Sequence, residues 1–221
     1  MPHKKQRPLE RSEGVDRDAS IIVIACEDKY APKVYFGQFV TSRVQFKVLS
    51  TEDCRSSPDQ IVQRLRTYKD EFQLGGSDQL WYLGDLDHWS EPNHIANLTM
   101  ALRECRQAGF WVAICNPCFE LWLLLHFVDV SNEQRWNASI VESELRTQAG
   151  GYSKVRGCVT PITSEMVEVA IERDRALDEF PAEDIPRTLT SRVYHIVDAL
   201  KQKQAIQLRP TVIRDRRRLG Q

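Results

Sequence analysis

Short apolar runs alternate with longer amphipathic segments between residues 20 and 130, and this alternation constrains the fold more than any other feature of the sequence. The first run, Ser20–Cys26 (SIIVIAC), is continuous and rich in β-branched residues, which is typical of a strand buried on both faces. Strand followed by helix, four times in succession, predicts a parallel sheet covered by helices on both faces and joined by right-handed crossovers. We therefore predict an α/β fold with about four parallel strands, at Ser20–Cys26, Val44–Leu49, Leu80–Leu83 and Phe110–Ile114.

Capping residues and helical periodicity predict helices between and beyond these strands. Ser57-Pro58 is a good N-cap and first-turn pair for a helix that runs to about Phe72. Glu91-Pro92 opens another helix that runs to Gln107. The remaining predicted helices begin at Pro32 and at Asn116-Pro117, or lie at about Asn137–Gln148, Ser164–Glu179 and Pro186–Lys203.

Changes of composition divide the chain into four parts. Residues 1–19 mix basic and acidic side chains without apolar periodicity, which predicts a flexible leader. Residues 20–130 form the α/β domain, and residues 131–205 form a helical extension that packs on it. Residues 206–221 are a basic tail, since Arg209–Gln221 holds five arginines and one aspartate.

Composition also excludes several classes of protein. With 42% hydrophobic residues and a formal net charge of −1, the chain is too apolar to be disordered and too balanced in charge to be a polybasic nucleic-acid coat. The longest apolar stretch, Phe110–Val130, is interrupted by polar residues, which indicates a buried helix and not a membrane span. The N-terminal segment lacks the apolar core of a signal peptide, and the six cysteines resemble reduced packing residues. We therefore expect a cytoplasmic protein.

Polar side chains follow three of the predicted strands. Glu27 comes directly after the first strand, and Asp85 and Asp87 follow the third. Asn116 follows the fourth strand, and Glu120 lies one turn into the next helix. Ligands of open parallel sheets bind at the carboxyl ends of the strands, so we expect these side chains to share one edge.

The repulsion between clustered carboxylates must be relieved for such a cluster to be stable. Two carboxylates about 4 Å apart repel each other by about 4 kcal/mol at an effective dielectric constant of 20. Such a cluster is stable only if it binds a cation or if some of its members are protonated. Oxygen ligands without a set of cysteines and histidines favour Mg²⁺ or Mn²⁺ over zinc.

Each candidate residue also has a purely structural explanation. Asp85 and Asp87 belong to a residue type that is common in turns. A carboxylate such as Glu120 is favoured in the first turn of a helix whatever its function. His126 can simply hydrogen-bond within an apolar helix, and Lys154 lies in a Gly-rich loop where it either approaches a phosphate or is solvated.

Other catalytic schemes find no motif in this sequence. The chain has no Gly-x-Ser-x-Gly nucleophile elbow, no phosphate-binding P-loop and no Gly-x-Gly-x-x-Gly dinucleotide fingerprint. Cys115-x-x-Cys118 is a close pair, but no second such pair supplies the remaining ligands of a zinc site.

Three longer segments form a specific pattern: IIVIACEDKYAPKVYF, WYLGDLDHW and AICNPCFELWLLLHF. This pattern resembles the RloB-like family, bacterial proteins related to Toprim domains and encoded in restriction and phage-defence loci beside an ATPase. Tyr152-Ser153-Lys154 and the stretch from Pro186-Arg187-Thr188 to Val193-Tyr194 also match. The resemblance covers roughly residues 20–200.

The resemblance implies a Toprim-like, Rossmann-like sheet with a mainly helical C-terminal extension. It implies a site for Mg²⁺ (or Mn²⁺) formed by Glu27, Asp85 and Asp87, with Glu27 also a general acid or base. Nearby it implies the family-typical residues Asn116, Glu120, His126 and Lys154. One departure is that Asp28, Ala31 and Pro32 stand where the family has Gly and, a few residues later, Thr-Glu.

Three functions are compatible with this pattern. The first is a Mg²⁺-dependent nuclease, an effector of anti-phage defence that works with a neighbouring ABC- or AAA-type ATPase. In it Asp85 and Asp87 bind the ion, and Glu120 belongs to the catalytic group. Its phosphate and substrate contacts come from Asn116, His126, Lys154, Arg216 and Arg217. The second is an interaction subunit of the ATPase that has lost turnover, which the departure at Ala31-Pro32 favours, and the third is a metal-dependent phosphotransferase.

Overall fold

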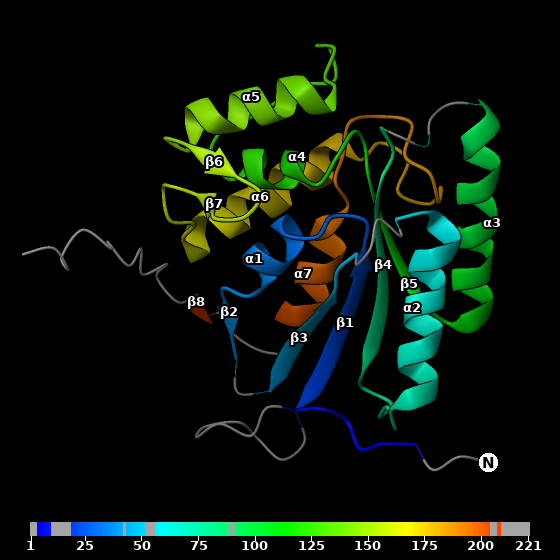
Figure 1. Cartoon of the computed structure of the whole chain (residues 1–221). Helices are drawn as coiled ribbons and strands as arrows, with labels where there is room; N and C mark the ends of the chain where they lie inside the picture. Colours follow the sequence, from blue (N-terminus) through cyan, green and yellow to red (C-terminus); the bar gives the residue numbers. More distant parts are fainter. Residues whose placement is uncertain are drawn as a thin grey trace, which may run out of the picture.

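A four-stranded, wholly parallel sheet forms the centre of the computed structural model, which describes residues 4–9, 19–41, 43–51, 56–87, 89, 92–203 and 207–208 (Figure 1). The strand order is β3-β1-β4-β5. These strands are β1 (Ser20–Cys26), β3 (Val44–Leu49), β4 (Gln79–Asp85) and β5 (Trp111–Cys115). The predicted α/β class and its parallel sheet are confirmed.

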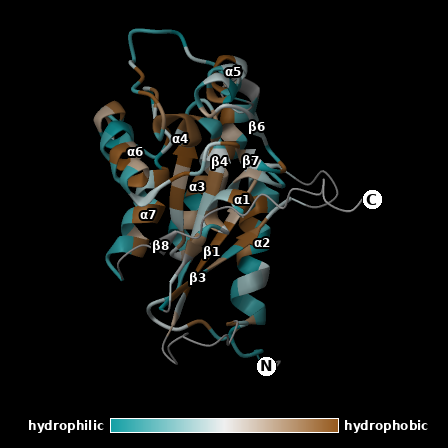
Figure 2. Cartoon of the chain, turned by 90° about the vertical axis from the view of Figure 1, so that its left-hand side faces the viewer, coloured by the Kyte–Doolittle hydropathy of each residue, from teal (hydrophilic) through white to brown (hydrophobic). Residues whose placement is uncertain are grey.

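Alternate residues of β1 enter two separate apolar cores, one on each face of the sheet. Ile22 and Ile24 belong to one core, whereas Ile21 and Val23 belong to the other. All seven residues of β1 are buried, which explains why the run is apolar throughout and does not alternate. Figure 2 shows the strands and the short helix α4 as mainly hydrophobic, with hydrophilic residues on the outer helices.

Helices cover both faces of the sheet (Figure 1). On one face lie α2 (Pro58–Glu71) and α3 (Pro92–Ala108), whose buried residues share a core with Ile21 and Val23. On the other lie α1 (Ala31–Phe36) and α7 (Val193–Lys201).

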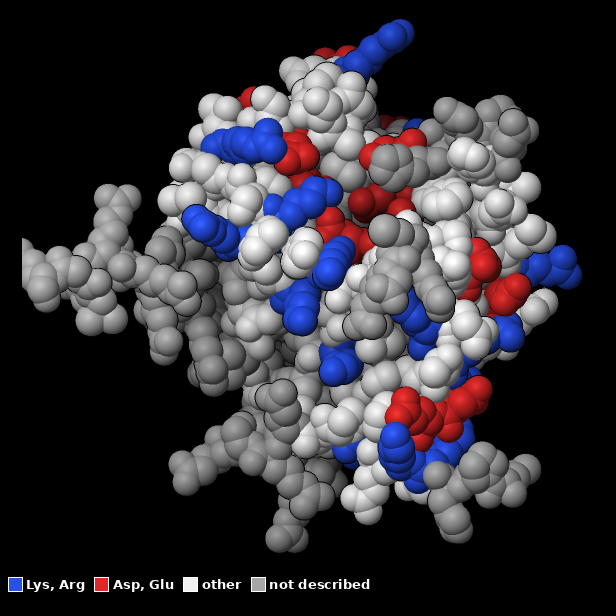
Figure 3. All heavy atoms as spheres, in the orientation of Figure 1, with Lys and Arg blue, Asp and Glu red and all other residues white. Residues whose placement is uncertain are grey.

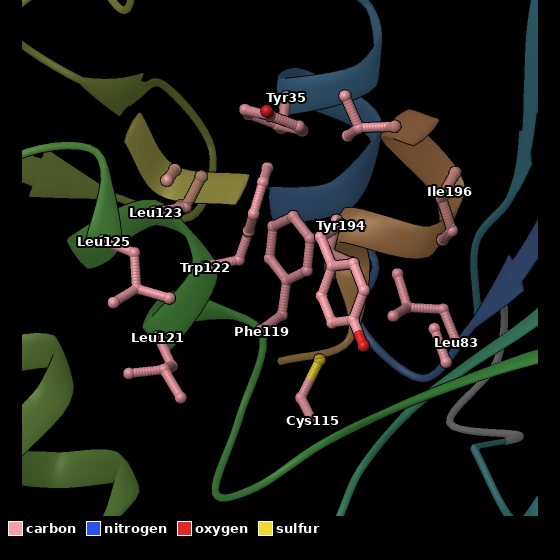
Figure 4. Close-up of a cluster of buried hydrophobic side chains, with 14 of the residues drawn as sticks. Tyr35, Leu83, Cys115, Phe119, Leu121, Trp122, Leu123, Leu125, Tyr194 and Ile196 are labelled. Atoms are coloured by element: carbon pink, nitrogen blue, oxygen red, sulfur yellow. The ribbon is translucent and has the colours of Figure 1, made fainter. Parts of the chain in front are cut away.

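Three further helices extend the core that contains Ile22 and Ile24. They are α4 (Glu120–Leu125), α5 (Ala138–Gln148) and α6 (Ser164–Leu177). Figure 4 shows Phe119 and Trp122 at α4 beside Tyr194 of α7. All three belong to the core that also contains Ile22 and Ile24. Residues on both sides of position 130 therefore share one continuous apolar core.

Two predicted helices begin later than expected, and the prediction for their first residues was wrong. Asn116 is held in extended backbone, because its N–H donates to Thr190 O (2.7 Å) and its carbonyl accepts from Thr190 N (3.1 Å). The helix expected from Asn116-Pro117 therefore starts at Glu120. The same pairing keeps Pro186–Arg192 out of a helix, so α7 starts at Val193.

Two short antiparallel pairs were not predicted. The helix predicted to begin at Pro32 ends at Phe36, the last residue of α1. The residues after it form β2 (Phe39–Val40), which pairs with β8 (Gln207–Leu208). The Gly-rich loop contains a hairpin of β6 (Tyr152–Ser153) and β7 (Gly157–Cys158). Gly151 and Gly157 have positive φ, which only glycine adopts readily.

Part of the predicted leader contacts the fold. Lys5 N donates to Glu71 O (2.8 Å), and Arg7 forms an ion pair with Asp78 (3.0 Å). In the part of the chain that the structure describes, no helix is long and apolar enough to cross a membrane, and the described cysteines are free thiols.

Candidate active site

Glu27 joins the carboxyl ends of two neighbouring strands. It follows β1 directly, and its Oε1 accepts a hydrogen bond from the backbone N–H of Asp85 (3.3 Å), the last residue of β4. The indole Nε1 of Trp89 donates to the same oxygen (2.9 Å). Two acidic residues 58 positions apart therefore meet at this edge of the sheet.

The turn after β4 is fixed by the segment that follows β5. Leu86 N donates to Cys115 O (2.8 Å), and Asp87 N donates to Pro117 O (3.1 Å). The side chain of Asp85 is fixed too, since its Oδ1 accepts from Phe119 N (2.9 Å). The Asp85-x-Asp87 pair is thus oriented by backbone contacts with residues 115–119.

Burial and mutual repulsion raise the pKa of the carboxyl groups at this edge. Burial raises the pKa of Glu27 to about 7; the hydrogen bonds from Trp89 and Asp85 act against this rise, and the charge of Asp87 adds to it. Burial also raises the pKa of Asp85 well above its usual range, and the charges of Glu27, Glu120 and Asp87 raise it further. The positive charge of Lys154 acts in the opposite direction.

A second cluster beside this one is built around Lys154. Its Nζ lies 3.1 Å from Asp28 Oδ2 and 3.2 Å from Glu120 Oε1. Tyr152 Oη donates to the same oxygen of Glu120 (3.0 Å). Burial alone would lower the pKa of Lys154, but Glu120 and Asp28 raise it above its usual value, so the ammonium stays charged. Lys154 therefore ties the β6–β7 hairpin to Asp28 and Glu120.

Asn116 and His126 are held by the fold itself. Asn116 Nδ2 donates to Thr188 O (2.9 Å), which adds to the backbone pairing with Thr190. His126 is buried, with Nδ1 2.8 Å from Trp122 O and Nε2 3.2 Å from the hydroxyl of Tyr35. A carbonyl can only accept, so Nδ1 carries the proton and Nε2 accepts from Tyr35. These contacts give both residues structural roles, and Arg216 and Arg217 lie outside the described residues.

Protonation of His126 is expected to destabilise the protein in acid. Burial lowers its pKa from 6.5 to about 4, so its contribution to stability is present above pH 6.5 and is lost as the pH falls toward 4. A shift of this size corresponds to about 3 kcal/mol. In urea titrations across this range, the wild type should lose about this much relative to His126→Gln.

The test uses the difference in the free energy of unfolding between the wild type and His126→Gln at each pH. Burial raises the pKa of Asp174 to about 6, and this carboxyl group stabilises the fold as the pH falls through 6, which opposes the effect of His126. Asp174 contributes equally to both proteins and cancels. Parallel stability curves for wild type and His126→Gln would contradict the assignment.

Gly84 leaves the space in which Tyr82 and Glu27 approach each other. A Cβ atom at position 84 would lie 2.7 Å from Tyr82 Cε1, 3.2 Å from Tyr82 Oη and 3.3 Å from Glu27 Oε1. The Tyr82 side chain is fully buried. Its hydroxyl is buried and forms no hydrogen bond with any residue that the structure describes.

Gly84→Ala is therefore expected to destabilise the protein by about 1–3 kcal/mol through overpacking. Gly76→Ala is the matched control, because a Cβ there meets nothing within 4 Å. The control should change the free energy of unfolding by less than about 0.5 kcal/mol. Equal stabilities of the two variants in urea denaturation would show that the contact at Gly84 is not restrictive.

The donor atoms at this edge suit a hard divalent cation. Glu27, Asp85 and Asp87 offer carboxylate oxygens. Burial raises the pKa of Glu27 and of Asp85, and the charges of neighbouring acids add to both rises. The orphaned hydroxyl of Tyr82 matches a site completed by a hydrated ion. Among the described residues, however, no three His, Cys, Asp or Glu side chains are arranged as a ready metal site. The residues fit Mg²⁺ in chemistry, and binding would require side-chain movement.

Sequence reasoning found the acids but missed the groups that orient them. Trp89 and Tyr82 lie in the WYLGDLDHW segment, so the resemblance contained both without indicating a role for either. Tyr152 was part of a matching triplet, and its bond to Glu120 depends on a hairpin that was not predicted.

Figure 3 shows Asp and Glu atoms gathered in the upper middle of the face seen in Figure 1, with Lys and Arg atoms beside and below them.

One comparison with known proteins gives a match. A model of the family described as RloB-like protein matches residues 22–200. No curated protein and no solved structure matches the chain. The matched range includes both carboxylate clusters and the helices that support them.

Proposed function

The chain belongs to the RloB-like protein family, and on this premise we propose that it is a Mg²⁺-dependent, Toprim-type nuclease that cleaves phosphodiester bonds in RNA or DNA. The observation that carries the proposal is the meeting of Glu27 with Asp85 at the carboxyl edge of the sheet. Defence against phage, together with an ATPase partner, is the biological setting that we propose for this activity.

In this proposal, Asp85 and Asp87 hold the ion with Glu27 beside them. The ion supplies charge stabilisation at the oxygens of the scissile phosphate when bound. Glu27 has a pKa near 7, which suits a group that takes a proton from an attacking water at neutral pH. Lys154 balances the charge of Glu120 and Asp28, which limits the repulsion that substrate phosphates meet.

The test is cleavage by the purified full-length chain of labelled single-stranded RNA and DNA. We expect cleavage with Mg²⁺ or Mn²⁺, none with EDTA, and recovery when Mg²⁺ is added in excess. Turnover of small phosphoesters without cleavage of polynucleotides would replace the nuclease with a phosphotransferase or phosphatase. The absence of all turnover would reject both enzymes.

A second candidate is an interaction subunit of an ATPase complex without turnover. It is favoured by the contacts of Asp28, the acidic residue among those that depart from the family pattern. Its Oδ1 accepts from Tyr30 N (2.6 Å) and Ala31 N (2.8 Å), and its Oδ2 accepts from Lys154 (3.1 Å). A carboxylate with this many donors is poorly placed to replace a missing catalytic acid. This candidate requires copurification with the ATPase and no cleavage under any metal condition.

A further inference from the structure

A groove of about 610 Å³ runs between the edge strand β3 and helix α2. α2 packs mainly on β1 and β4, so the outer strand β3 is less covered on that side. Lys47 lies opposite Val23 in the strand register and so points to the α2 side of the sheet. The polar part of the lining includes Lys33, Lys47, Gln60, Gln63, Arg64 and Thr67, with Ser50, Tyr68 and Glu71 also present.

The charge of this groove is positive. Lys33 and Lys47 are exposed, and neither forms an ion pair with an acidic side chain of the described residues. Arg64 adds a third positive charge to the lining. The acidic residue of the lining, Glu71, is paired with Lys5 (2.7 Å), so its charge is compensated. Figure 3 shows Lys and Arg atoms in the middle of this face, below the acidic group.

Arg64 links the lining of the groove to the backbone that precedes Glu27. Its guanidinium donates to Cys26 O (2.8 Å) and to Thr51 Oγ1 (3.2 Å), and the Thr51 hydroxyl also donates to Cys26 O (3.1 Å). Cys26 is the last residue of β1 and directly precedes Glu27. Arg64, a lining residue of the groove, therefore contacts the residue directly before Glu27.

We infer that this groove binds the sugar–phosphate backbone of a single-stranded polynucleotide and leads it to the carboxylates. A cationic channel with amide and hydroxyl groups is what such a backbone requires. The volume of the groove lies in the range of small-molecule sites, which suits a few nucleotides of one strand and not a duplex. The inference rests on the proposed function, because it names how that site would receive its substrate.

The test is binding of short, fluorescein-labelled oligouridylate and oligothymidylate, measured by anisotropy in EDTA so that no cleavage occurs. For single strands, each phosphate contact contributes a salt slope of about 0.7. At 0.1 M salt, Lys33→Ala/Lys47→Ala should therefore weaken binding about 25-fold and lower the slope by about 1.4. The two oligonucleotides distinguish RNA from DNA as the source of the strand.

The matched control is Arg175→Ala/Lys201→Ala, which removes two exposed positive charges from α6 and α7 on the other face of the sheet. It should bind within about 2-fold of the wild type, the change expected from weak long-range screening. Acetylation footprinting of the wild type provides a readout without any substitution. Lys33 and Lys47 should lose reactivity when the strand is bound, whereas Lys201 should not.

Wild-type affinity of the Lys33/Lys47 variant, or the absence of any binding, would overturn the inference. Tighter binding of a duplex, lost in the same variant, would overturn the assignment to a single strand. Failure of the proposed nuclease function gives a different result from failure of the groove inference. In that case the strand binds through Lys33 and Lys47, but no Mg²⁺-dependent cleavage occurs. Cleavage that needs Asp85 but not Lys33 and Lys47 would reject the groove alone.

Discussion

Replacing Asp85 with asparagine is expected to lower Mg²⁺-dependent cleavage by about 100-fold or more, while the protein stays folded. Asparagine keeps the Oδ1 that accepts from Phe119 N, so the turn after β4 retains its anchor. It removes the negative charge that the ion needs. The rate of cleavage of a labelled single strand, at saturating Mg²⁺, measures this effect.

The same substitution should raise the stability of the metal-free protein. Burial raises the pKa of Asp85, and the charges of Glu27, Glu120 and Asp87 raise it further, so a neutral replacement avoids both the burial of a charge and the repulsion. In EDTA, Asp85→Asn should therefore melt at a higher temperature than the wild type. Adding Mg²⁺ should raise the melting temperature of the wild type but not that of Asp85→Asn. A damaged fold would lower the melting temperature of the metal-free protein. Loss of cleavage together with a higher melting temperature would therefore indicate that a metal ligand is missing.

Asp129→Asn is the control for this experiment, because it removes one exposed carboxylate outside both clusters. Its cleavage rate and its response to Mg²⁺ should match those of the wild type. Cleavage by Asp85→Asn within about 2-fold of the wild-type rate would remove Asp85 from the proposed metal site.

The sheet and its acidic edge were predictable because their signals are local. A continuous β-branched run such as Ser20–Cys26 can satisfy its burial only inside a sheet. The position of Glu27 next to Asp85 then follows from the shared direction of parallel strands. That β1 and β4 are neighbours, which brings the two residues into contact, comes from the structure.

The parts that sequence reasoning missed depend on partners far along the chain. The segment Pro186–Arg192 has helical spacing, but Thr190 and Ser191 donate three hydrogen bonds to the buried carboxylate of Asp174 (2.5–2.9 Å). These bonds, with the pairing to Asn116, outweigh a weak local preference for helix. Trp89 is a similar case, since only the folded chain shows that its indole reaches Glu27.

Arg192→Met is expected to destabilise the protein by about 3–5 kcal/mol, the largest effect on stability that we predict. Arg192 is buried and forms a two-pronged ion pair with Asp178, through Nε (3.0 Å) and Nη2 (2.9 Å). It also donates to the carbonyls of Phe180, Glu183 and Asp184. Its loss leaves the buried carboxylate of Asp178 without its counter-charge, with only the hydroxyl of Tyr194 still donating to it (3.0 Å), and removes the donor to three part-buried carbonyls. Urea denaturation at neutral pH measures the difference.

Arg187→Met is the matched control, because Arg187 is 70% exposed and pairs with Glu183 at the surface. Surface pairs contribute at most about 1 kcal/mol, so this variant should remain close to the wild type. Asp178→Leu combined with Arg192→Met should recover part of the lost stability, since it removes the unpaired charge. Equal stabilities of Arg192→Met and Arg187→Met would contradict the assignment. Because Thr190 and Asn116 pair two residues from Arg192, loss of this anchor should also loosen the edge of the sheet where the acids meet.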